Sequence, residues 1–103
     1  MVDHITDTKT ATVNIILHGI CEILNVVCPT SVEANTSFTV TYNCHNKGAT
    51  DTCYGKITID GNLVSGTRWD ATINAGATRN CSATIPGIAT NKSIIIEVGY
   101  TTV

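Results

Sequence analysis

The fold is decided by residues 37–46, which read Ser-Phe-Thr-Val-Thr-Tyr-Asn-Cys-His-Asn. Apolar and polar residues alternate in this stretch, so one face of an extended chain carries Phe38, Val40, Tyr42 and Cys44. Successive side chains of a strand point to opposite faces of its sheet. The stretch therefore predicts a half-buried antiparallel strand with its apolar face inward.

The same alternation recurs in segments farther along the chain. These segments are residues 52–60, the short pair 63–64, residues 78–85 and residues 92–100. Asp60-Gly61 predicts a tight hairpin turn, because a type I′ turn needs positive φ at both central positions. Residues 66–70 lack the alternation, and we expect an irregular crossing segment there.

The first 28 residues leave two alternatives open. A helix would place an apolar stripe on one side, composed of Val13, Ile16, Leu17, Ile20, Leu24 and Val27. Gly19 and the many β-branched residues lower helix propensity. We therefore favour two strands, about residues 10–17 and 20–27, bent at His18-Gly19. About seven short strands with turns at intervals of about ten residues predict a β-sandwich.

A sandwich built from these strands has a predictable core and domain division. We expect residues 1–18 to form an N-terminal arm with an extra strand and residues 19–103 to form the sandwich. The predicted core contains Val27, Val32, Phe38, Val40, Tyr42, Ile57, Ile59, Ile85, Ile94, Ile96 and Val98.

Composition agrees with one all-β domain and restricts its partners. The 103 residues include 18 Thr, 13 Ile and 9 Val, which suit a pleated surface. Only six residues are Lys or Arg and the formal net charge is −2, so we expect neither nucleic acid nor an anionic membrane as partner. The most apolar run, residues 13–28, is interrupted by polar residues, whereas a membrane span needs about 20 mostly apolar ones. No secretory signal is recognisable at the N-terminus, so we expect synthesis without export or earlier removal of a signal.

Residues 22–101 resemble the CARDB-type immunoglobulin-like domains of bacterial, archaeal and viral surface proteins. Four stretches carry the resemblance: residues 25–42, with the Cys-Pro-Thr-Ser-Val start of a first strand, and residues 46–51, 57–61 and 73–78. The resemblance implies an all-β fold, an immunoglobulin-like antiparallel sandwich of about seven strands, here with an extra N-terminal strand. It also implies a role in adhesion, spacing or assembly rather than catalysis.

One departure from that family concerns the edge of a sheet. The family pattern continues with a further strand after the equivalent of residues 92–100, whereas this chain stops at Val103. A sandwich without that strand exposes unpaired backbone groups beside apolar side chains. We predict that the extra strand fills this place, either within its own chain or in a neighbouring subunit. Its residues include Thr10, Thr12, Val13, Ile15 and Leu17.

Five cysteines give several possible pairings, and their odd number leaves at least one unpaired. Cys44 and Cys53 lie on the inward faces of consecutive predicted strands near the connecting turn. We predict a disulfide between them, with buried free thiols as the alternative. Cys81 also faces inward, and a second disulfide with Cys28, or with Cys21, remains open.

No recognisable constellation predicts catalysis, a metal or a cofactor. Cys44, His45 and Cys53 are the nearest approach to a metal site, but His45 alternates to the face opposite Cys44. Trp69 is the only tryptophan. We expect it to cover an open end of the core with its N–H bonded nearby, or else to act as an exposed anchor at a protein interface.

These observations predict a non-enzymatic structural protein that assembles through strand edges. We expect a virion component (coat, decoration or tail) whose partners are copies of itself or other particle proteins, and hence a homo-oligomer. The alternative is a secreted or cell-surface adhesion module of a bacterium or archaeon. A small hydrolase or metal-dependent enzyme is the least favoured hypothesis, because the polar residues are scattered.

Overall fold

The computed structural model describes residues 2–13 and 15–102, and these residues form strands and no helix. The predicted all-β character is confirmed, and the helical alternative for the N-terminal segment is wrong. Met1, Asn14 and Val103, which fall within the predicted arm, extra strand and sandwich, lie outside the described residues. The strands are β1 (Cys21–Val27), β2 (Phe38–Asn46), β3 (Asp51–Ile59), β4 (Asn62–Leu63), β5 (Trp69–Ile73), β6 (Thr78–Ile85) and β7 (Ile94–Tyr100).

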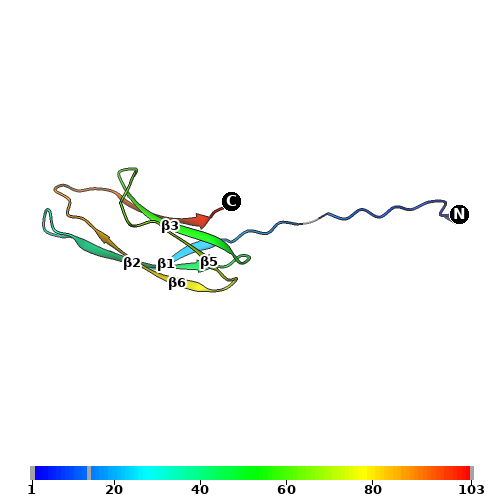
Figure 1. Cartoon of the computed structure of the whole chain (residues 1–103), viewed down its shortest axis with the longest axis horizontal. Helices are drawn as coiled ribbons and strands as arrows, with labels where there is room; N and C mark the ends of the chain where they lie inside the picture. The colour runs from blue at the N-terminus through cyan, green and yellow to red at the C-terminus, as the bar shows by residue number, and fades with distance from the viewer. Residues whose placement is uncertain (1, 14, 103) are drawn as a thin grey trace.

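The strands form two antiparallel sheets that lie one over the other (Figure 1). The first sheet has the order β1-β2-β6. In the second sheet β3 is central, with β7 on one side and β4 and β5 on the other, since residues of β3 pair with both sides at once. The chain therefore crosses from one sheet to the other between β2 and β3.

The core lies between the sheets and follows the alternation of the strands. Its buried hydrophobic residues are Val40, Tyr42, Cys44, Cys53, Ile57, Val64, Ile73, Cys81 and Ile85. The predicted core positions Val40, Tyr42, Ile57 and Ile85 are confirmed, and Phe38, Ile59, Ile94, Ile96 and Val98 pack against them half-buried.

Two predicted core residues, Val27 and Val32, are exposed at 64% and 40%. The pairing of β1 with β2 shifts register between Leu24 and Val27, and Asn25 adopts a φ of 54°. A register shift of one residue turns the following side chains to the other face of a sheet. Val27 therefore leaves the core, and Val32 lies in the loop beyond β1.

The hairpin after β3 is confirmed, but the segment that follows it differs from its prediction. Asp60 and Gly61 have φ values of 49° and 84°, as a type I′ turn requires. Trp69 and Asp70, predicted within an irregular segment, begin β5. Thr67 anchors the approach to β5, because its buried hydroxyl accepts from the Ile57 amide at 3.1 Å and donates to the Val64 carbonyl at 2.7 Å.

The segment before β1 is an extended arm without a strand partner. Residues 10–13 and 15–17, predicted as a strand, pair with nothing in the described chain, so the version in which the arm folds back on its own sandwich is wrong. Figure 1 shows the arm projecting from one end of the two-sheet body, and the molecule measures 82 × 28 × 24 Å. An isolated strand gains no ladder hydrogen bonds, which explains why alternation alone did not make a strand here.

Candidate functional site

The two sides of the two-sheet body differ in how fully their inward side chains are buried. On the side of β6, Ile85 is fully buried and Cys81 nearly so, although β6 also lacks an outer strand partner in the described chain. On the side of β7, the inward residues Ile94, Ile96 and Val98 are only half-buried. No strand within residues 2–13 and 15–102 pairs with the outer edge of β7, which leaves a row of unbonded amide and carbonyl groups.

The strand of the first sheet beside this edge is β1, which contacts β7. Of its three exposed apolar side chains, those of Leu24 and Val27 pair in register with the outward residues Asn43 and Thr41, so they face away from the second sheet, and the third is that of Val26. We call the outer edge of β7, together with the half-buried side chains of Ile94, Ile96 and Val98, the open edge. Exposed apolar surface next to unpaired backbone is the combination that accepts an added strand.

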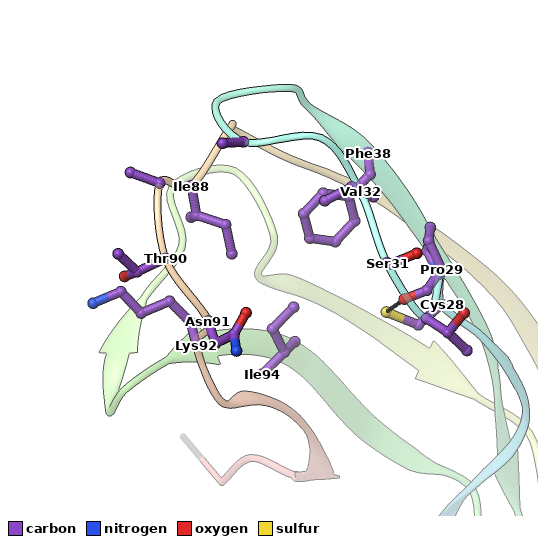
Figure 2. A pocket seen from close by; sticks show the side chains of 13 residues that line it. Cys28, Pro29, Ser31, Val32, Phe38, Ile88, Thr90, Asn91, Lys92 and Ile94 are labelled. Atoms are coloured by element: carbon purple, nitrogen blue, oxygen red, sulfur yellow. Dashed lines mark hydrogen bonds between the residues drawn. The ribbon is translucent and has the colours of Figure 1, made fainter.

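A cavity of about 520 Å³ lies beside the start of β7 (Figure 2). The loops that line it are at the end of the body remote from the arm (Figure 1). The loop after β1 and the loop before β7 enclose it, and Val32, Phe38, Ile88 and Ile94 give it an apolar lining. The Asn35 amide donates to the Ile88 carbonyl at 2.9 Å, which ties the two loops together.

The arm leaves the body from a root that is firmly bonded. The Asp51 carboxylate accepts from the Gly19 amide at 2.9 Å and lies 3.3 Å from His18 Nδ1. The His18 ring stacks on Tyr100 at the end of β7, with centroids 4.3 Å apart. His18 and Gly19 are thus held to β3 and β7 of the second sheet.

Asn46 is the centre of this root, although the sequence placed it only at the end of a predicted strand. Its side chain is fully buried and has all four of its hydrogen-bonding positions occupied. The amide oxygen accepts from the amides of Ile20 and Gly48, at 3.1 and 3.0 Å. The amide nitrogen donates to the carbonyls of Ala49 and Ile73, at 2.8 and 2.9 Å. One side chain therefore joins the arm root, the β2–β3 turn and β5.

Asp51 makes the arm root sensitive to acid. Hydrogen bonds from the Gly19 amide, the Thr52 amide and His18 lower the pKa of this carboxyl, because they favour its charged form. A carboxyl whose pKa is lowered by folding stabilises the folded protein at pH values above its pKa in the unfolded chain, about 3.9. That stabilisation is lost as the pH falls through the pKa in the folded protein.

We expect Asp51→Asn to remove this part of the acid response. As the pH is lowered from 5 to the lowest pH at which the protein still folds, the urea midpoint of wild type should fall more than that of the variant. Asp70→Asn, at an exposed ion pair with Arg68, serves as the control. Identical pH profiles for wild type and Asp51→Asn would contradict the role given to Asp51.

The structure leaves all five thiols free and arranges them differently from the predicted pairs. Cys44 and Cys53 are both buried, as predicted, but no disulfide joins them; they lie on strands of different sheets, and the sulfur next to Cys53 is that of Cys21, 2.9 Å away. The predicted second pair is also not formed. Cys28 is exposed beyond the end of β1, while Cys81 is buried on the inward face of β6.

Trp69 is half-buried and its indole N–H donates to the buried Tyr42 hydroxyl at 2.9 Å. This is the bond expected of a core-covering tryptophan, and the Arg79 guanidinium lies 4.6 Å from the ring centre. A role as interface anchor stays a prediction.

Trp69→Phe separates these two roles. It leaves the Tyr42 hydroxyl without its donor, so we expect the free energy of unfolding to fall by about 1–2 kcal/mol in chemical denaturation. We expect the mass of any assembly to stay unchanged in light scattering. Loss of assembly without loss of stability would instead identify Trp69 as an interface anchor.

His45 and Cys44 take opposite faces, as predicted, since Cys44 is buried while His45 Nδ1 lies 2.9 Å from the Thr78 hydroxyl on the outer surface. In the described part of the chain, no three His, Cys, Asp or Glu side chains are grouped so as to hold a metal ion. That part also has no helix with the length and apolarity needed to cross a membrane.

Comparison with known proteins found no matching family model, curated protein or solved structure.

Proposed function

We propose that the protein is a non-enzymatic structural subunit that assembles with copies of itself by strand addition. The arm of one copy adds to the outer edge of β7 in the next copy and covers the open edge. The observation that carries this proposal is the presence, in one chain, of an exposed apolar arm and an unpaired apolar sheet edge.

The arm has the residue pattern that strand addition requires. Ala11, Val13, Ile15 and Leu17 would share one face of an extended arm, because they alternate in sequence. The three larger members of this face are 71–78% exposed in the single chain. In strand addition, main-chain hydrogen bonds give affinity and alternate side chains fill the apolar surface below.

The positions of the two surfaces favour contact between copies. The arm departs before Cys21 at one end of β1, whereas the cavity begins at Cys28 beyond its other end. An added strand of eight residues, 10–17, would extend over about 26 Å, close to the length of the seven-residue β7. Such a head-to-tail contact repeats from copy to copy and builds a filament or, if the rotation closes, a ring.

The finer fold and the biological setting belong to the same proposal. We take the two sheets to be a CARDB-like, immunoglobulin-like sandwich in which the arm supplies a missing edge strand in the neighbour. We place the protein in a virion as a coat, decoration or tail component, because such a component needs one repeated contact between identical copies. An adhesion module at a cell surface is the alternative setting for the same contact.

Light scattering of the full chain over a range of concentrations tests the proposal. We expect masses that rise with concentration as multiples of 10.9 kDa. Electron microscopy of the same sample should show rings or filaments of one repeat. A concentration-independent monomer would refute assembly, and a two-fold dimer with no further growth would refute the head-to-tail geometry.

A further inference from the structure

Two thiols from different sheets meet at the base of the arm. Cys21 begins β1 and is half-buried, whereas Cys53 is a fully buried residue of β3. Their sulfur atoms lie 2.9 Å apart. The S–H···O contacts made by Cys28, Cys53 and Cys81 are much longer, at 3.6–3.7 Å.

We propose that Cys21 and Cys53 are a site of covalent modification at which thiol–disulfide exchange with a low-molecular-weight disulfide, such as oxidised glutathione, forms a bond between the two sheets. The Cys21 thiolate attacks one sulfur of the reagent and releases one reagent thiol. The Cys53 thiolate then attacks Cys21 Sγ in the mixed disulfide and releases the second reagent thiol. In sum, two protein thiols are oxidised to one disulfide and one reagent disulfide is reduced to two thiols.

Access and geometry select this pair among the neighbouring thiols. Cys21 is half-buried whereas Cys53 is fully buried, so Cys21 is the more accessible thiol and meets the reagent first. Cys44 also lies nearby, but it pairs in register with Ile23, so Cys21 is its diagonal neighbour on the adjacent strand. Diagonal neighbours have Cα atoms about 7–8 Å apart, whereas a disulfide needs about 4.4–6.8 Å.

The surroundings of the two thiols set the rate of the reaction. Burial raises the pKa of Cys21, and burial together with the hydrogen bond to Cys21 raises the pKa of Cys53 to about 12. Only the thiolate is nucleophilic. We therefore expect slow exchange near neutral pH and an increase of about tenfold per pH unit between pH 7 and 9.

The disulfide would join residues 32 positions apart in sequence and would link the arm root to the central strand of the second sheet. A disulfide stabilises chiefly by restricting the unfolded chain, and more so when it closes a longer loop. We expect the Tm to rise by about 10 °C or more on oxidation.

The test oxidises the full chain with oxidised glutathione at pH 8.5 and maps peptides without reduction. We expect a Cys21–Cys53 link with the loss of two hydrogens, together with the rise in Tm. Cys28→Ser, at an exposed thiol, is the matched control and should retain both. Cys21→Ser should lose both, while circular dichroism of the reduced variant shows that it folds.

Three results would overturn the inference: no linked peptide after prolonged oxidation, a Cys21–Cys44 link in its place, or the correct link without a rise in Tm. The inference does not depend on assembly. The same link should form in a monomeric chain carrying the arm substitutions described below, so failure of one proposal leaves the other open to its own test.

Discussion

Replacing Val13, Ile15 and Leu17 together by aspartate will reduce the assembled protein to its 10.9 kDa monomer. Each of these side chains is exposed in the single chain and is buried in a neighbour if the arm adds to β7. Full burial of such a side chain contributes about 1.5–3 kcal/mol, so losing three weakens association by at least a thousandfold. Size-exclusion chromatography with light scattering at equal protein concentration measures the change.

The matched control places the same three charges on the other face of the arm. Thr8→Asp, Thr10→Asp and Thr12→Asp alternate with the apolar positions; Thr10 and Thr12 would face solvent in the added strand, and Thr8 lies just before it. We expect this variant to assemble like wild type. Equal loss of assembly in both variants would indicate a non-specific effect of charge, and unchanged assembly in the first would eliminate the arm as the assembling segment.

The second large effect is expected at the base of the arm, where Asn46→Asp should lower the free energy of unfolding by about 3–5 kcal/mol. The substitution keeps the shape of the side chain but replaces its donor group by an acceptor. A buried carboxylate then faces the carbonyls of Ala49 and Ile73, which now lack their donor. Since a domain of this size is stable by about 5–15 kcal/mol, much of the variant should unfold at moderate urea concentration.

Asn43→Asp is the control for this substitution. Asn43 lies on the same strand as Asn46 but on the opposite face, where it is only partly buried. Asn43→Asp therefore adds the same charge outside the core. We expect a change of about 0.5 kcal/mol or less. A loss below about 1 kcal/mol for Asn46→Asp in urea denaturation would show that Asn46 does not organise the arm root.

Alternation predicted the strands well wherever one face of a strand is covered by the opposite sheet. The predicted ends of β2, β3, β6 and β7 lie within two residues of the observed ends, because burial of one face imposes a period of two. β5 was missed, since Trp69 and Asp70 follow a glycine-containing turn and the strand has only five residues. The prediction that Val27 belongs to the core was wrong, because no pattern in the sequence marks the shift in pairing after Leu24.

The arm root and the thiols show the limit of local patterns. The inward direction of Cys44 and Cys53 follows from alternation and is confirmed, but alternation does not tell which sheet each strand joins. The crossing between β2 and β3 separates these two residues and brings Cys21 to Cys53. The bonds of Asn46 join residues up to 27 positions apart, so the sequence near Asn46 predicted no more than the end of a strand.

Residue-resolved hydrogen exchange of β7 tests the central claim most directly. The amides of β7 that do not bond to β3 should be protected in assembled wild type. They should exchange rapidly in the variant in which Val13, Ile15 and Leu17 are replaced by aspartate. Amides bonded to β3 should be protected in both proteins, which controls for unfolding. Rapid exchange of the outer β7 amides in assembled wild type would contradict strand addition at this edge.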